Sequence, residues 1–172
     1  LVRQIENTNM IHMMKLNKIL PLGNPQLYEI SEPVKKEELA DLQPAIQDLH
    51  DIIIEFQIKY NAGRAVAAPQ IGVMKRIICW NVKTPVTMIN PQLSDLNEEM
   101  FELWDDCMCF PNLLVKVRRH KSCTLRFQDE NWQEQVWHLE DDLSELIQHE
   151  YDHLDGILAT QRAIDNKSFR WR

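Results

Sequence analysis

The chain has 172 residues, with 19 Lys and Arg against 26 Asp and Glu, so its formal net charge is −7. Four glycines exclude collagen-like, flexible-linker and low-complexity classes, and the composition is that of one soluble globular domain. The acidic balance argues against DNA or general nucleic-acid binding. The longest apolar runs are far shorter than the roughly 20 residues of a membrane span.

The four cysteines are not preceded by a secretory signal, so we expect reduced thiols and a cytoplasmic protein. Residues 1–14 include the first methionine, Met10, and are interpreted as an N-terminal extension or an expression remnant. Residues 16–30 carry turn signals and are expected to form an extended arm.

Apolar residues recur at helical spacing over 37–60, which predicts a helix. Pro44 is expected to lie near its start or to divide it, and Gly63 suits a helix stop. Six segments rich in β-formers follow, and Pro91 is expected to close the second. They are residues 76–82, 85–89, 101–104, 113–117, 123–128 and 135–139.

A last helix is predicted to begin near Asp141 and to end near Gly156, with Asp142 and Glu145 forming a capping box. The strand spacing favours antiparallel pairing. The predicted fold class is therefore α+β, with antiparallel strands packed around the C-terminal helix and one N-terminal helix. The basic run 118–121 is interpreted as a solvated strand end rather than an anion site.

The predicted C-terminal helix carries an HExxH pattern, His149-Glu150-x-x-His153. Histidines four residues apart share one helix face and can bind one metal ion, with the glutamate as general base. The alternative is a polar helix face with two solvated histidines. A third ligand is expected upstream, where Cys107 and Cys109 are the best thiolate candidates.

Three ordered motifs resemble those of the peptide deformylase family. They are GRAVAAPQ at 63–70, DDCMC at 105–109 and QHEYDHL at 148–154. The resemblance runs from about residue 15 to about residue 158. It implies a catalytic domain over 15–165, followed by a short basic tail over 166–172. We expect that tail to be unstructured, the alternative being contact with ribosomal RNA.

The resemblance implies that Cys107, His149 and His153 hold a metal ion with water as the fourth ligand. The ion is usually Fe²⁺ in this family, with Zn²⁺, Ni²⁺ or Co²⁺ possible, and the residues themselves do not choose among these ions. The implied reaction is hydrolysis of the formyl group from formyl-methionine on newly made polypeptides, with release of formate. This is N-terminal processing in protein biosynthesis, with transient ribosome contact as a possible accompaniment.

The resemblance also implies roles for residues around the metal. Glu150 would be the general base, while the Gln70 side-chain amide and the Met108 backbone N–H would stabilise charge on the formyl oxygen. The peptide would add as a strand beside Gly63, Ala65 and Asp106, and an apolar pocket would take the methionine side chain.

The chain departs from the family pattern at four positions. Ala65 and Asp106 replace glycines, Asp105 replaces glutamate, and Cys109 replaces serine and is interpreted as a spare thiol. Glu145 either caps the helix, which we favour, or projects toward the methionine pocket. The alternatives to an active deformylase are a related hydrolase with a shifted N-acyl or peptide substrate and a non-catalytic metal-binding homologue.

Overall fold

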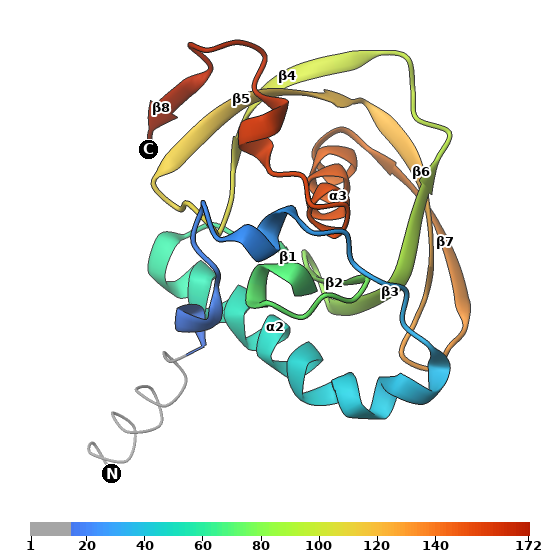
Figure 1. Ribbon diagram of the computed structural model, residues 1–172. Helices are drawn as coiled ribbons and strands as arrows, with labels where there is room; N and C mark the ends of the chain where they lie inside the picture. The colour runs from blue at the N-terminus through green and yellow to red at the C-terminus, as the bar shows by residue number, and fades with distance from the viewer. Residues whose placement is uncertain (1–14) are drawn as a thin grey trace.

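The computed structural model describes residues 15–172 (Figure 1). The predicted extension over 1–14 lies outside the described residues. Within 15–172, no helix is both long enough and apolar enough to cross a membrane. The arm over 16–30 contains two 3₁₀ turns, η1 (Leu16–Lys18) and η2 (Pro25–Tyr28). Further 3₁₀ turns are η3 (Lys36–Glu38), η4 (Ala68–Ile71) and η5 (Ala159–Arg162).

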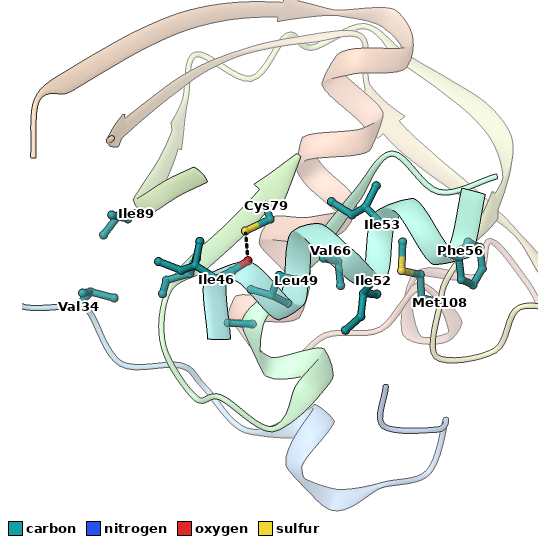
Figure 2. Packing of buried hydrophobic residues seen from close by; sticks show 12 residues of the cluster. Val34, Ile46, Leu49, Ile52, Ile53, Phe56, Val66, Cys79, Ile89 and Met108 are labelled. Carbon is teal, nitrogen blue, oxygen red and sulfur yellow. Dashed lines mark hydrogen bonds between the residues drawn. The ribbon is translucent and has the colours of Figure 1, made fainter. Parts of the chain in front are cut away.

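Helix α2 (Leu39–Tyr60) is the predicted N-terminal helix, and Pro44 lies inside it without dividing it. Its buried face packs on strands β1 (Ala65–Ala67) and β2 (Ile77–Asn81) in the core cluster of Figure 2. Removal of each such side chain from water contributes about 1.5–3 kcal/mol. The helix ends at Asn61, which adopts a left-handed conformation with φ of 52°, rather than at Gly63.

The strands form two antiparallel sheets. The five-stranded sheet has the order β1-β2-β3-β6-β7, and the three-stranded sheet has the order β4-β5-β8. The bounds in the larger sheet are β1 (Ala65–Ala67), β2 (Ile77–Asn81), β3 (Pro85–Ser94), β6 (Ser122–Gln128) and β7 (Glu134–Glu140). Those in the smaller sheet are β4 (Met100–Asp106), β5 (Leu113–His120) and β8 (Phe169–Trp171).

Two strand predictions were wrong. Strand β3 continues past Pro91, because a register shift between Ile89 and Gln92 accommodates the proline, with Asn90 at φ of 51°. The tail over 166–172, expected to be unstructured, contributes β8, whose Phe169 pairs with Val115 of β5.

Helix α3 (Asp141–Leu154) lies between the two sheets and contacts both (Figure 1). Its fully buried Ile147 and Leu154 pack with Met88, Leu125 and Phe127 in a second core cluster. Because both sheets press on α3, its polar face is also enclosed, and this is the face that carries the HExxH pattern.

Gly156 follows α3 with φ of 70°, and a Cβ there would lie 2.5 Å from the carbonyl oxygen of Tyr28. We expect Gly156→Ala to lower the free energy of unfolding by more than about 2 kcal/mol, because left-handed strain adds to this backbone clash. Gly23→Ala is the matched control, since φ is 96° there but nothing lies within 4 Å of the added Cβ. Urea unfolding measures both variants, and equal losses would contradict the clash.

Candidate active site

Three potential metal ligands meet between the sheets. Helix α3 supplies His149 and His153, and Cys107 follows the last residue of β4. Their ligand atoms all lie within 4.8 Å of one another, and Cys107 Sγ is 3.3 Å from His153 Nε2. All three side chains are buried. One thiolate and two imidazoles form a donor set that suits several divalent transition metals.

The orientation of the rings fits a metal. Asp105 accepts a hydrogen bond from His149 Nδ1 at 2.9 Å, which leaves His149 Nε2 for the triad. Burial lowers the pKa of His153 well below its usual value, so this ring is neutral, as a ligand must be. Burial raises the pKa of the Cys107 thiol, and a bound cation would favour its thiolate.

A buried arginine, Arg119, forms an ion pair with Asp105. Arg119 Nη2 lies 3.1 Å from Asp105, and Nη1 lies 2.5 Å from Asp152, which Arg162 also contacts at 2.8 Å. Burial alone would raise the pKa of Asp105, but His149 and Arg119 hold it below its usual value. The prediction of a solvated strand end is therefore wrong for Arg119, which is 3% exposed.

Glu150 lies beside the triad and is also buried. Within residues 15–172, its Oε2 atom has no hydrogen-bond partner. Burial raises its pKa to about 7, so the carboxyl group can be either charged or neutral near neutral pH. An unpartnered carboxylate oxygen facing a cavity is available to a substrate or a water molecule.

Gln70 is held close to the triad by its neighbours. Its Oε1 accepts from Ala67 N at 2.8 Å, and its Nε2 faces the thiols of Cys107 and Cys109 at 3.6 and 3.5 Å. The arm fixes the two loops, since Leu20 N donates to Gln70 O and Leu22 N donates to Cys109 O. The Cys109 thiol thus contacts Gln70 and is not part of the metal-ligating group.

One cavity of about 50 Å³ collects these groups. It is lined by eight of the nine site residues expected from the sequence. The ninth, His153, does not line the cavity but contacts Cys107, which does. The eight are Gly63, Ala65, Gln70, Asp106, Cys107, Met108, His149 and Glu150.

Other lining residues differ from expectation. Glu145 does not cap α3, because Glu140 is the N-cap and the Glu145 carboxylate pairs with Arg64 inside the cavity. Asp106 pairs with Arg172 from the strand-forming tail. The sequence alone predicts no role for Arg64, although this residue lies within the first motif.

The comparisons with known proteins agree with this geometry. Residues 16–169 match the sequence model of the polypeptide deformylase family. The chain belongs to this family. A peptide deformylase 1 of Prochlorococcus marinus is 33% identical over 168 residues, covering 91% of this chain and 85% of the relative. A peptide deformylase of Treponema pallidum is 34% identical over 148 residues, covering 85% and 86%.

Solved structures of deformylases have the same fold. The peptide deformylase of Thermotoga maritima superposes with a TM-score of 0.75 at 28% identity, covering 86% of this chain and 97% of that one. The enzyme of Synechococcus elongatus, solved in complex with actinonin, gives 0.78 at 25% identity, covering 86% and 79%. The family, the α+β fold class and the class of metal-dependent hydrolase acting on N-formyl groups are thus confirmed.

Proposed function

We propose that this deformylase removes the formyl group from formyl-methionine on new polypeptides at the cavity between β1 and α3. The observation that carries the proposal is the meeting of Cys107, His149 and His153 with the unpartnered carboxylate of Glu150 in one buried cavity. Buried polar atoms in structural clusters usually have a hydrogen-bond partner, so an unpartnered carboxylate oxygen within residues 15–172 favours a functional role.

We infer that Cys107, His149 and His153 hold a divalent ion, with Fe²⁺ as the first expectation and Zn²⁺, Ni²⁺ and Co²⁺ as alternatives. When bound, such an ion supplies Lewis acidity toward the formyl oxygen and makes water acidic enough to react near neutral pH. Asp105 keeps the His149 ring in the orientation that this site needs.

Glu150 is the proposed general base. It takes a proton from the attacking water as the new C–O bond forms at the formyl carbon. It then gives that proton to the nitrogen of methionine as the C–N bond breaks, which releases formate and a free amino terminus. A pKa of about 7 suits both steps, because the carboxyl group can accept and donate near neutral pH.

Two donors are proposed to stabilise the negative charge that develops on the formyl oxygen. These are the Gln70 Nε2 amide and the Met108 backbone N–H, from two residues that line the cavity with Cys107. Loss of one such donor usually raises the barrier by about 2.7–4 kcal/mol. The thiols of Cys107 and Cys109 support the placement of Gln70, because both lie within 3.6 Å of its amide nitrogen.

The peptide is proposed to bind along the outer strand of the larger sheet. Strand β1 occupies one end of that sheet, so a peptide can extend it by main-chain hydrogen bonds beside Gly63 and Ala65. Asp106 also lines the cavity and is paired with Arg172. The Ala65 methyl group leaves less space for the peptide backbone than the glycine that the family pattern has at this position.

The setting of the reaction is also inferred. Four free cysteines support a reducing compartment, the cytoplasm. Transient contact with the ribosome stays a prediction.

The decisive experiment loads anaerobically purified protein with Fe²⁺, Zn²⁺, Ni²⁺ or Co²⁺ and measures formate released from a formyl-methionyl peptide. We expect about one ion per chain and release of formate. Stoichiometric metal without formate for every ion would instead identify a non-catalytic metal-binding homologue.

A further inference from the structure

One wall of the catalytic cavity is charged. Arg64, just before β1, and Glu145, on α3, both line the cavity, and Arg64 Nη2 lies 3.0 Å from Glu145 Oε1. The Glu145 side chain is only 13% exposed, whereas the Arg64 side chain is 35% exposed, so the carboxylate is largely withdrawn from solvent and the arginine is half-buried. A cavity that takes only apolar side chains would not carry a largely buried carboxylate paired with an arginine in its wall.

The guanidinium group is fixed from outside the cavity. Arg64 Nη1 lies 2.7 Å from Asp142, which is 72% exposed and does not line the cavity. Asp142 and Glu145 are three residues apart on one face of α3 and hold both Nη atoms. An arginine has five N–H donors, so further donors are available to a ligand group beside the pair.

The remaining walls beside this pair are apolar. Phe56, Met108 and Leu146 line the same cavity. The backbone of Gly63 closes it tightly, since a Cβ there would lie 2.7 Å from the Phe56 ring and 3.0 Å from Met108 Cε. The cavity therefore offers both apolar contact and hydrogen-bonding groups to a side chain that enters it.

We propose that Arg64 and Glu145 set the selectivity for the first side chain of the substrate. They allow an unbranched side chain with a hydrogen-bonding tip, such as glutamine or methionine sulfoxide, to enter nearly as well as an apolar one of the same length. This inference rests on the proposed function, because a formyl carbon at the triad places the adjoining side chain in this cavity.

The physical reason is the loss of hydrogen bonds on burial. In an apolar pocket an amide or sulfoxide gives up its contacts with water without replacement. Beside Arg64 and Glu145 the same group finds both donors and acceptors. The pair thus removes the main penalty against a polar side chain and leaves the apolar stem contacts unchanged.

The test compares formyl-glutaminyl and formyl-norleucyl peptides of otherwise identical sequence, with kcat/KM measured from formate release. The metal-loaded wild-type protein is expected to process the two within about tenfold of each other. In the double variant Arg64→Leu, Glu145→Leu the glutamine-to-norleucine ratio should fall by at least about tenfold, with norleucine still processed. The matched control is the double variant Arg126→Leu, Glu134→Leu, which removes an exposed arginine–glutamate pair outside the cavity and should leave the ratio unchanged.

Two results would overturn the inference: a wild-type preference for norleucine above about 100-fold, or a ratio unchanged in the double variant. If the double variant does not fold, the wild-type ratio decides alone. If the wild-type protein releases formate from neither of these peptides and also not from a formyl-methionyl peptide, the proposed function is contradicted instead.

Discussion

Glu150→Gln is expected to lower kcat for a formyl-methionyl peptide by about 10²–10⁴-fold while leaving the bound metal in place. The amide has the size of the carboxyl group and keeps the cavity filled, but it cannot accept the proton of water. Glu150 is not one of the three grouped ligands, so metal content should not change.

The control lies at the end of the same helix. Asp155→Asn neutralises a carboxylate that pairs with Arg76 at 2.7 Å, outside the catalytic cavity, and should leave kcat within about twofold of the wild-type value. Metal analysis and thermal unfolding accompany the formate assay for both variants. A Glu150→Gln protein with normal turnover would remove Glu150 from the mechanism.

The helix that carries the site could be predicted because its geometry is local. His149, Glu150 and His153 are fixed relative to one another by one helical turn, so spacing alone places both imidazoles on one face. Cys107 is different, because it lies more than 40 residues earlier. Spacing left Cys107 and Cys109 as alternatives, and only the order of the three motifs selected Cys107.

The wrong predictions concern residues whose surroundings come from distant parts of the chain. Arg119 follows another arginine in a basic run, and nothing local shows that Asp105 and Asp152 enclose it. Glu145 has the spacing of a capping residue, but Arg64, 81 residues earlier, draws its carboxylate into the cavity.

The strand errors have the same origin. Pro91 does stop ordinary ladder pairing, and only the partner strand β6 shows that a bulge absorbs it. The C-terminal residues are few and include three basic side chains, and they become a strand because β5 offers a free edge.

Arg119→Met is expected to lower the free energy of unfolding by about 3 kcal/mol, because it leaves two buried carboxylates short of a partner. Methionine keeps much of the side-chain volume, so loss of charge dominates over loss of packing. We place the effect at the lower end for broken buried pairs, since Asp105 keeps His149 and Asp152 keeps Arg162. Metal affinity should also fall, by about 10–100-fold, because Asp105 orients His149.

Arg162→Met is the matched control, since Arg162 contacts the same Asp152 but its side chain is 47% exposed. Its removal should lower the free energy of unfolding by no more than about 1 kcal/mol, as is usual for solvent-screened pairs, and metal affinity should not change. Urea unfolding of the two metal-free variants measures the first difference, and metal titration measures the second. Equal losses in both variants would mean that the buried pairs of Arg119 contribute no more to the free energy of unfolding than the exposed pair of Arg162. If Arg119→Met loses stability but keeps its metal affinity, Arg119 stabilises the fold and has no role in metal binding.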